Sequence, residues 1–585
     1  MTSFLHTTAR PDGLAASPAV PRPSAVRLPH WLRALDAWMA QPRSARAVIV
    51  GLAVYLLVAA NWPLWLALAR IGGAPSVYMR SIGAMAVLTV LGTVAMLSLT
   101  AWTRWMKPLW FAVVLIAALA QHYMLTYRVV MDPSMAANAF QTDLHEARDL
   151  MGWRMLFDVL IVVALPAWWL LRVRVQPMRL WSQLWRNVAL LAGALAVAVA
   201  GGAAMSRELA PLMRNHVTLR YMMNPIAGLY SASAVVIKPL FRHRRQLIPI
   251  SGGAALGVSY ATQARPPLFV VVVGETARAD HFALNGYARD TTPGLAGRGV
   301  TSLRNVHSCG TNTLASVPCM FSSLGKVGYE GSKDDHENLL DVAQADGLAV
   351  LWIENQSGCK GVCDRVPNAS AGEGLPPDAK SVLCDGDECL DDVMLRNIDQ
   401  RIAALPAERR ARGVLLVMHQ MGSHGPAYAK RSAPDAKRFT PECKTNVLAD
   451  CSHSELMNAY DNSIAHTDRF LSRTIDWLQT QSSHYDTGML YMSDHGESLG
   501  EYGLFLHGLP YNIAPDVQKH VPMVAWFGEG LRAREKLSEA CLHGDRDVAL
   551  THDNLYHTVL GVMDLQTPTY KPALDAFAHC KGPAA

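Results

Sequence analysis

Charged residues are scarce in this chain. Asp, Glu, Lys and Arg make up 17% of its 585 residues, against roughly 25% in a typical soluble domain. Acidic residues are scarcest early: residues 1–250 contain 8 Asp and Glu against 24 Lys and Arg, whereas residues 251–585 contain 40 against 29. The two net charges, +16 and −11, argue against a purely soluble protein. The length, several times that of a typical ~150-residue domain, allows at least two unlike domains.

Cysteine is absent before Cys309, and tryptophan is rare after Trp185. All ten Cys lie between Cys309 and Cys580, while 12 of the 15 Trp lie at or before Trp185. Clustered cysteines are typical of an oxidising compartment, and Trp is enriched where helices leave a membrane. The basic part also lacks a continuous basic face, because its Arg residues are scattered between apolar runs. A nucleic-acid partner is therefore not expected.

Charge is nearly missing from five long apolar stretches. They are residues 47–69, 81–101, 108–127, 154–172 and 187–205. Each has the length of about 20 residues that crosses a ~30 Å hydrocarbon core as a helix. We therefore predict a transmembrane domain of five helices over residues 47–205. Asp158 is an exception within the spans, and a single acidic residue does not suggest an intramembrane ion path.

The tail, residues 1–46, lacks any long apolar run. It contains six Arg together with Pro18, Pro21, Pro23 and Pro29. This composition predicts a disordered cytoplasmic tail with a short helix over residues 30–39. No cleavable signal peptide is expected, because the first apolar stretch starts late and is too long.

The loops between the spans predict the orientation of the protein. Lys and Arg dominate the tail, the second loop and the fourth loop, which is typical of cytoplasmic segments. The third loop is acidic, whereas the first loop, with Arg70 and Arg80, departs from the rule. Five spans then place everything after residue 205 outside, in agreement with the cysteines.

Residues 206–267 connect the two domains. Residues 206–250 are amphipathic and contain seven Lys and Arg, the composition of helices that lie on an anionic membrane surface. Residues 251–267 contain three Gly and two Pro and are predicted to be a linker. The second domain is therefore predicted to span residues 268–585.

Short apolar runs in the second domain predict four strands, at residues 268–273, 348–353, 414–418 and 489–492. Continuous runs suit the centre of a mostly parallel sheet covered by helices on both faces. Three of the runs end in polar residues, at Glu275, His419 and Asp494. Ligands of open α/β sheets bind beyond the carboxyl ends of the strands, so we expect these residues to converge.

Carboxylates and histidines at the strand ends form a candidate metal site. Asp494 and His495 are adjacent, Glu275 follows another strand, and His424 and His507 complete the set. Nitrogen and oxygen donors in this number suit Zn²⁺. The alternative is that these residues only cap the helices that follow. Because the site needs no Cys as a ligand, the thiols remain available for disulfides.

A nucleophile is expected between residues 308 and 319. Small and hydroxyl residues at a helix N-terminus leave backbone N–H groups free to bind a phosphoryl group. The candidates are Ser308, Thr311, Thr313 and Ser316. The residues alone do not choose among them, because each could instead be a helix N-cap.

Four motifs resemble those of the lipid A phosphoethanolamine transferases, which include the mobile colistin-resistance enzymes. They are GETAR at residues 274–278, CGTNTLASVPC at 309–319, SHGP at 423–426, and SDHGESLGE at 493–501 leading to HG at 507–508. The resemblance covers nearly the whole chain from about residue 45. It implies a bundle of five transmembrane helices, basic surface helices, and an α/β catalytic domain with the alkaline phosphatase and sulfatase fold.

The resemblance also implies the metal chemistry. Thr313 would be the nucleophile, and Glu275, Thr313, Asp494 and His495 would hold the principal Zn²⁺. A Thr hydroxyl is a weak nucleophile until a metal ion lowers its pKa, and the same ion can stabilise charge in an in-line displacement.

Further residues would act on the phosphoryl group. The resemblance makes His424 and His507 ligands of a second zinc ion or of phosphate, Lys360 a phosphate contact, and Glu497 a neighbour of the substrate. These side chains could stabilise phosphoryl oxygens or protonate the departing alkoxide.

Three residues of the third loop recur every four positions. On a helix, Asn138, Thr142 and Glu146 would share one face. In the family, the matching positions contact the phosphoethanolamine head group, and a carboxylate such as Glu146 suits an ammonium. The alternative is an ordinary solvated helix face. Gln356 is a further candidate substrate contact, although some relatives have Asn there.

Ten cysteines in an exported domain are most simply five disulfides. The near pairs are Cys309 with Cys319, Cys359 with Cys363, Cys384 with Cys389, and Cys443 with Cys451, which leaves Cys541 with Cys580.

The resemblance implies a zinc-dependent transfer in two steps. Thr313 would take phosphoethanolamine from phosphatidylethanolamine and pass it to a lipid A phosphate. Lipid A would become less negative and bind cationic polymyxin and colistin more weakly. The expected enzyme is a multi-pass monomer in the inner membrane of a Gram-negative bacterium, with its catalytic domain in the periplasm.

Other functions remain open. The same chemistry could modify the lipopolysaccharide core or a periplasmic glucan, or transfer glycerol phosphate as lipoteichoic-acid synthases do. The five cysteine pairs and the predicted face at residues 138–146 favour lipid A. A periplasmic phosphatase or sulfatase would use similar residues without an acceptor. A sensor or transporter would not need the full set of metal and nucleophile residues.

Overall fold

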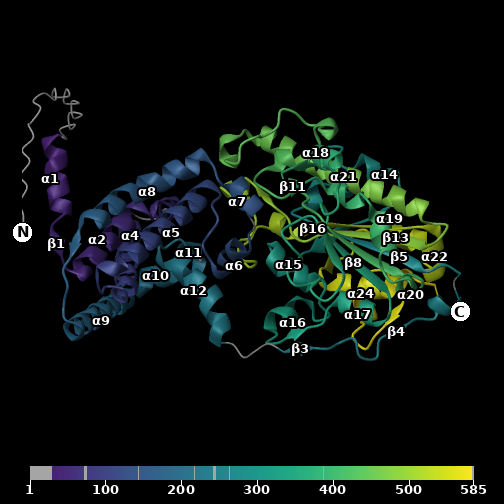
Figure 1. Ribbon diagram of the computed structural model, residues 1–585, viewed down its shortest axis with the longest axis horizontal. Helices are drawn as coiled ribbons and strands as arrows, with labels where there is room; N and C mark the ends of the chain where they lie inside the picture. Colours follow the sequence, from purple (N-terminus) through teal and green to yellow (C-terminus); the bar gives the residue numbers. More distant parts are fainter. Residues whose placement is uncertain are drawn as a thin grey trace, which may run out of the picture.

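The computed structural model describes residues 29–71, 75–142, 144–216, 218–241, 246–262, 264–386 and 388–582. Within these ranges, the chain forms a helical half and an α/β half that meet near the middle of the long axis (Figure 1). Residues 1–28 of the predicted tail lie outside the described residues. The short helix expected over residues 30–39 is present as α1 (His30–Met39).

The helical half contains the predicted spans. Four helices are long and apolar enough to cross a membrane: α4 (Pro75–Ser98), α5 (Lys107–Thr126), α8 (Trp153–Arg172) and α9 (Leu180–Ala204). The first predicted stretch is a pair of helices, α2 (Ala45–Ala59) and α3 (Trp62–Ile71), bent by 49° at their junction. Counted as one span, this pair brings the number to the expected five.

The bend between α2 and α3 has a local cause. Pro63 has no N–H to donate, and the Ala59 carbonyl instead accepts a hydrogen bond from Gln121 Nε2 at 2.8 Å. The Leu57 carbonyl likewise accepts a hydrogen bond from Trp65 Nε1, at 3.1 Å. Side chains therefore replace the backbone hydrogen bonds that the bend removes.

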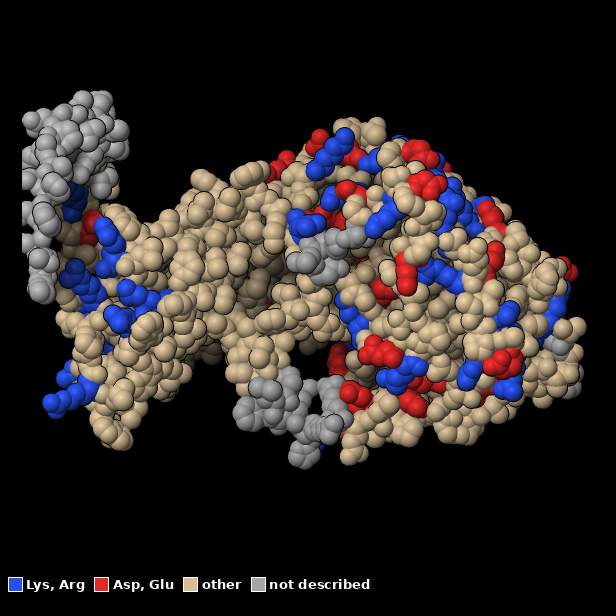
Figure 2. Space-filling model, in the orientation of Figure 1, with Lys and Arg blue, Asp and Glu red and all other residues tan. Residues whose placement is uncertain are grey.

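The last span begins earlier than predicted, at Leu180 rather than residue 187. The two buried polar residues of its first part, Gln183 and Asn187, both donate to Ala101 O, at 2.5 and 2.9 Å. Because these amides are satisfied, the helix can include them. Figure 2 shows that Lys and Arg gather at the end of the helical half remote from the α/β half. This distribution is expected if the two ends lie on opposite sides of a membrane.

An eight-stranded sheet forms the centre of the α/β half. Its order is β17-β6-β16-β13-β5-β12-β8-β9. The strands are β5 (Pro267–Gly274), β6 (Thr301–His307), β8 (Ala349–Glu354), β9 (Asn368–Ser370), β12 (Val414–His419), β13 (Asp486–Ser493), β16 (His520–Phe527) and β17 (Leu550–Thr551). The four predicted strands are the neighbours β13, β5, β12 and β8, all parallel, which confirms that prediction. The antiparallel β16 was not predicted.

Strand β5 packs on both faces of the sheet. Phe269 and Val271 join a core with α15 (Thr313–Met320), α17 (Leu339–Ala345) and α24 (Asp553–Val562). Val270 and Val272 join a second core with α19 (Ile398–Ala403) and α21 (His453–Thr480). Helices therefore cover both faces (Figure 1), which explains why β5 is apolar at every position rather than alternately.

The predicted linker is part of the α/β half. Within residues 251–267, β4 (Ala255–Leu256) pairs with β18 (Leu565–Gln566), and Tyr260 OH donates to Met563 O at 2.7 Å. Further upstream, β3 (Leu247–Ile248) pairs with β7 (Asp335–His336). The packed structure thus begins before residue 268, because Leu256 and Tyr260 contact the core. The helices expected before it are α10 (Ser206–Asn215), α11 (Thr218–Tyr221) and α12 (Ile226–Phe241).

Two short helices lie between the halves, α6 (Pro133–Gln141) and α7 (Leu144–Leu150). The prediction that Asn138, Thr142 and Glu146 share one face of a continuous helix is wrong. Helix α6 ends at Gln141, where Thr142 turns to extended backbone and its Oγ1 donates to Asn138 O at 3.0 Å. A Thr hydroxyl can compete in this way with the next helical turn. Asp143 and the side chain of Glu146 lie outside the described residues.

We predict that Gly257→Ala loosens the segment once expected to be a linker. A Cβ at this position would lie 2.0 Å from Asp564 Oδ1, and overpacking of this kind typically costs about 1–3 kcal/mol. Limited proteolysis of the full chain, followed by mass spectrometry, should show faster cleavage around residues 251–262. Gly252→Ala is the matched control, because a Cβ there meets nothing within 4 Å. Equal cleavage of the two variants would contradict the packed arrangement.

Candidate active site

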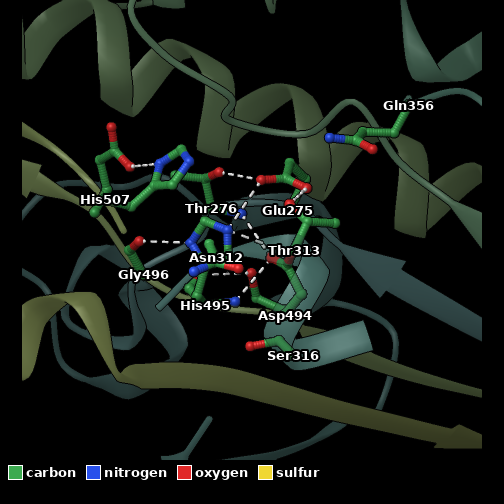
Figure 3. A network of polar contacts seen from close by, with 12 residues as sticks. Glu275, Thr276, Asn312, Thr313, Ser316, Gln356, Asp494, His495, Gly496 and His507 are labelled. Carbon is green, nitrogen blue, oxygen red and sulfur yellow. Dashed lines mark hydrogen bonds and ion pairs between the residues drawn. The ribbon is translucent and has the colours of Figure 1, made fainter. Parts of the chain in front are cut away.

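Two adjacent strand ends bring three titratable residues together. Gly274 of β5 is in register with Ser493 of β13, so Glu275 follows one strand and Asp494 and His495 follow the other. All three side chains are fully buried. One candidate ligand atom from each lies within 4.8 Å of the others, and Figure 3 shows the side chains directed toward one another. The convergence predicted for Glu275 and Asp494 is therefore present. His419, the third residue expected there, instead pairs with Glu354, with its Nδ1 3.0 Å from Glu354 Oε2.

Hydrogen bonds orient the two residues from β13. Asp494 Oδ1 accepts from Thr276 N at 3.1 Å and from His495 N at 2.7 Å. His495 Nδ1 lies 2.9 Å from Gly496 O, which suits an Nδ1–H donor and leaves Nε2 with its lone pair. Asp494 Oδ2 and His495 Nε2 are buried without a hydrogen-bond partner among the described residues. Metal-binding histidines and carboxylates are typically held in this way, with one atom bonded and the other free.

The charges of this cluster favour a cation. Burial and the neighbouring Glu275 raise the pKa of Asp494 to about 7. Burial would lower the pKa of His495, but Asp494 and Glu275 raise it to about 10. Burial would raise the pKa of Glu275, but the nearby His495, whose Nε2 lies 3.3 Å from Glu275 Oε1, holds it well below its ordinary value. Two buried carboxylates thus attract positive charge, and buried charges in proteins are paired or bind metal ions.

Thr313 is the first residue of α15, next to this cluster. Asn312 caps the helix, because its Oδ1 accepts a hydrogen bond from Ala315 N at 2.9 Å. Thr313 Oγ1 donates to Glu275 Oε2 at 3.1 Å (Figure 3). The expected helix N-terminus is therefore present, and it directs a hydroxyl at the carboxylates.

The other three candidate nucleophiles have different partners. Ser308 Oγ donates to Gly310 O at 2.5 Å, Thr311 Oγ1 donates to Leu509 O at 2.6 Å, and Ser316 Oγ accepts from Gly310 N at 3.0 Å. These hydroxyls stabilise the turn before α15. The geometry thus favours Thr313 over the alternatives that the residues alone left open.

Glu275 also belongs to a second group of candidate ligands, with His424 and His507. The ring centroids of the two histidines are 5.4 Å apart, and those of His495 and His507 are 4.3 Å apart. His507 Nδ1 lies 2.7 Å from Glu497 Oε2. Burial and the charge of His495 lower the pKa of His507 to about 3, so its imidazole is neutral and can act as a ligand. One buried carboxylate therefore joins two potential binding positions.

Glu497 has a partner on each carboxylate oxygen. Besides the contact with His507, its Oε1 accepts a hydrogen bond from Tyr428 OH. Burial raises the pKa of Glu497 to about 8. Glu497 therefore lies near the cluster, as expected, but it acts by holding His507 in place.

Two predicted substrate contacts lie outside the cluster. Lys360 Nζ donates to Ser357 O and Oγ at 2.9 and 2.8 Å, and Gln356 Oε1 accepts from Ser357 N at 2.6 Å. Figure 3 shows Gln356 apart from the cluster, in the loop that follows β8. Both residues would have to change partners to reach a ligand at Thr313.

Asn138 of the helical half does approach the cluster. Gly508, which follows His507, has a φ of 87°, and a Cβ there would lie 2.9 Å from Met135 Cε and 3.7 Å from Asn138 Nδ2. Gly508 N also donates to Thr311 O, beside the nucleophile turn, at 2.7 Å. A side chain at position 508 would therefore separate α6 from the cluster.

All five predicted disulfides are present, including the long-range pair of Cys541 and Cys580. The pair of Cys309 and Cys319 closes the turn that carries Thr313 and the start of α15.

Three residues that support the cluster were not expected from the sequence. Thr276 Oγ1 donates to Glu275 Oε1 at 2.5 Å, and its φ is 59°. Tyr428 supports Glu497, as described above, and Arg431 Nε donates to His424 O at 2.9 Å. Thr276 lies inside the GETAR motif, and backbone with positive φ at a non-glycine residue often marks a functional site. Tyr428 and Arg431 gave no signal, because they act through contacts between distant segments.

Comparisons with known proteins find relatives over most of the chain. Residues 88–240 match a family model described as phosphoethanolamine transferase EptA/EptB, and residues 267–565 match the sulfatase model. EptA of Escherichia coli K12 is 36% identical over 502 residues, covering 84% of this chain and 88% of the relative. Mcr-1 of Escherichia coli, named a phosphatidylethanolamine transferase, is 34% identical over 550 residues, with 91% and 97% covered.

A solved structure extends the similarity to both halves. The integral membrane lipooligosaccharide phosphoethanolamine transferase A of Neisseria meningitidis superposes with a TM-score of 0.85 and 30% sequence identity, covering 93% of this chain and 100% of the other. The α/β half accordingly has the sulfatase fold, and the helical half is that of a membrane protein. The chain belongs to the phosphoethanolamine transferase family that includes EptA and Mcr-1.

Proposed function

We propose that this enzyme transfers phosphoethanolamine from phosphatidylethanolamine to a phosphate of lipid A, through a covalent phosphoethanolamine adduct of Thr313. The observation that carries the proposal is the contact of 3.1 Å between the Thr313 hydroxyl and Glu275, inside a buried group of metal-ligand residues. The names of the relatives support the donor and the acceptor. Mcr-1 is named for phosphatidylethanolamine, and the Neisseria protein for lipooligosaccharide, whose lipid part is lipid A.

We propose zinc as the cofactor. Glu275, Thr313, Asp494 and His495 would hold one ion, and the fit rests on the two buried atoms without hydrogen-bond partners, Asp494 Oδ2 and His495 Nε2. Zinc, when bound, lowers the pKa of a ligated hydroxyl and stabilises negative charge on phosphoryl oxygens. The second group, Glu275 with His424 and His507, would bind either a second ion or the phosphoryl oxygens.

The residues of the cluster account for both steps of the transfer. Thr313 Oγ1 forms a bond to phosphorus while the bond from phosphorus to the diacylglycerol oxygen breaks. Glu275 Oε2, which already accepts the Thr313 hydrogen bond, takes the hydroxyl proton. His424 supplies a proton to the departing oxygen, because His507 is neutral. In the second step, a lipid A phosphate oxygen attacks the same phosphorus, the bond from phosphorus to Thr313 Oγ1 breaks, and Glu275 returns the proton to Thr313.

The donor head group would lie along the segment between the halves. Asn138 lies next to Gly508, at the edge of the cluster, and could contact the head group there. Thr142 and Glu146 follow Asn138 in the same segment. A carboxylate such as Glu146 would complement the ammonium. Gln356 and Lys360 would contact the phosphate after leaving Ser357.

The protein would work in the inner membrane of a Gram-negative bacterium, as a monomer with its α/β half in the periplasm. Five disulfides in that half suit an oxidising compartment, and all proposed site residues come from one chain. An added ammonium group makes lipid A less negative, which weakens its attraction for polymyxin and colistin.

We predict that Thr313→Ala abolishes the transfer. Loss of a nucleophile typically lowers kcat by more than about 10³-fold. Lipid A from cells that express the variant should lack the added phosphoethanolamine mass that the wild type produces, and intact-protein mass spectrometry should find no adduct. Thr313→Ser keeps a hydroxyl and should retain measurable transfer. Modified lipid A in the Thr313→Ala strain would remove Thr313 from the nucleophile role.

We predict that Gly422→Ala lowers the zinc content of the purified protein and its activity together. Gly422 has a φ of 53°, and a Cβ there would lie 2.6 Å from Glu275 O, so the backbone of a ligand would have to move. Gly286→Ala is the matched control, because its φ is 102° but a Cβ meets nothing within 4 Å. In the control, the substitution adds only the strain of a left-handed backbone, which lowers the free energy of unfolding by about 1–2 kcal/mol. Elemental analysis per chain measures the difference, and full zinc in Gly422→Ala would contradict the assigned ligands.

A further inference from the structure

One turn supports both histidines of the second ligand group. Residues 428–431 follow His424 closely, and Arg431 Nε donates to His424 O at 2.9 Å. At the other end of the turn, Tyr428 OH donates to Glu497, whose second oxygen lies 2.7 Å from His507 Nδ1. The positions of His424 and His507 therefore depend on where this turn lies.

The same turn is bonded to the helical half. Asp149, near the end of α7, contacts Lys430 Nζ through Oδ1 at 2.7 Å and Arg431 Nη2 through Oδ2 at 2.8 Å. Arg431 Nη1 also lies 3.3 Å from Glu388 Oε2. The side chains of Asp149 and Arg431 are only 5% and 4% exposed, so their ion pair is shielded from water and strengthened by the low local dielectric, whereas Lys430 is half exposed.

Two other side-chain contacts between the halves reach a separate loop, and a backbone hydrogen bond from Phe505 N to Tyr127 O, at 3.2 Å, reaches the segment of His507 alone. Arg154 pairs with Asp450 at 2.9 Å, with both side chains at least half exposed, and Tyr127 OH donates to Asn446 O at 3.0 Å. Both reach the loop that the disulfide of Cys443 and Cys451 closes, and no residue of that loop belongs to the cluster. They can dock the halves together, whereas the Asp149 contact also extends to the two histidines.

The location of Asp149 links it to the donor site as well. It follows Asn138 on the α6–α7 segment, and Asn138 lies beside Gly508 at the edge of the cluster. We propose that Asp149 is a positioning residue for the transfer: by holding Lys430 and Arg431, it fixes His424 and His507 relative to the segment that would bind the donor head group. The inference rests on the function proposed above, and it adds a residue that no motif contains.

The test is Asp149→Asn in the full-length protein, reconstituted in vesicles that contain phosphatidylethanolamine. We expect kcat to fall about tenfold or more, because a displacement of about 1 Å can cost about 10²-fold in rate. KM should stay within about twofold, since the head-group residues are unchanged. The ion of the first group should be retained, so at least one zinc per chain should remain, because Glu275, Asp494 and His495 are held by the strand ends. A general loss of folding would instead lower both zinc content and the thermal midpoint.

Two further variants sharpen the test. Arg431→Lys keeps the positive charge but cannot bond Asp149 and His424 O at once, so it should lower kcat as much as Asp149→Asn. The double variant should be no worse than either single one, because both remove the same link. Asp450→Asn is the matched control: it breaks an Arg–Asp pair between the same halves that does not reach the cluster, and its kcat should stay within about twofold of the wild type.

The outcomes separate this inference from the proposed function. If wild-type protein transfers phosphoethanolamine and Asp149→Asn matches Asp450→Asn, the positioning role is overturned and the function stands. Full activity of Arg431→Lys, or loss of all zinc in Asp149→Asn, would likewise overturn it. If the wild type forms no adduct with phosphatidylethanolamine, both proposals fail together.

Discussion

A single buried carboxylate, that of Glu275, organises the catalytic end of the sheet. Its side chain contacts Thr276 and Thr313 through hydrogen bonds and lies 3.3 Å from His495 Nε2. A charge in this position is costly unless every lone pair has a donor or a cation. The register of β5 with β13 supplies Asp494 and His495 from the neighbouring strand, and α15 supplies Thr313. The register of the sheet therefore brings Glu275, Asp494 and His495 together without a separately folded loop.

Around this carboxylate, rigid and adjustable parts are separated. The first ligand group is attached to strand ends at the centre of two hydrophobic cores. The histidines of the second group come from loops, at residues 424 and 507, and need outside support. That support crosses from the helical half, whose segment at residues 133–150 touches both loops. A reaction between two lipids suits this division, since the membrane part can set the geometry of the loops that meet them.

Much of the fold and of the site could be predicted from the sequence, because the strongest signals are local. The four central strands are continuous apolar runs, and Glu275, Asp494 and His495 follow them directly. The strands near the edge of the sheet were harder to predict. Strand β6 includes polar residues such as Arg304 and Asn305, so it is not a continuous apolar run. The break after Gln141 depends on the Thr142 hydroxyl, and the packing of residues 251–267 on contacts with Met563 and Asp564. The link from Asp149 to Arg431 joins positions 282 residues apart, a distance that no periodicity reveals.

The disulfide of Cys309 and Cys319 makes the closure of the nucleophile turn depend on the redox state of its surroundings. Its two cysteines are ten residues apart in the sequence, and Thr313 lies between them. Thiols stay reduced in the cytosol and pair only in oxidising compartments. A newly made chain would therefore carry this turn without its covalent closure until the α/β half reaches an oxidising compartment. The helical half has no such requirement, because residues 1–308 contain no Cys.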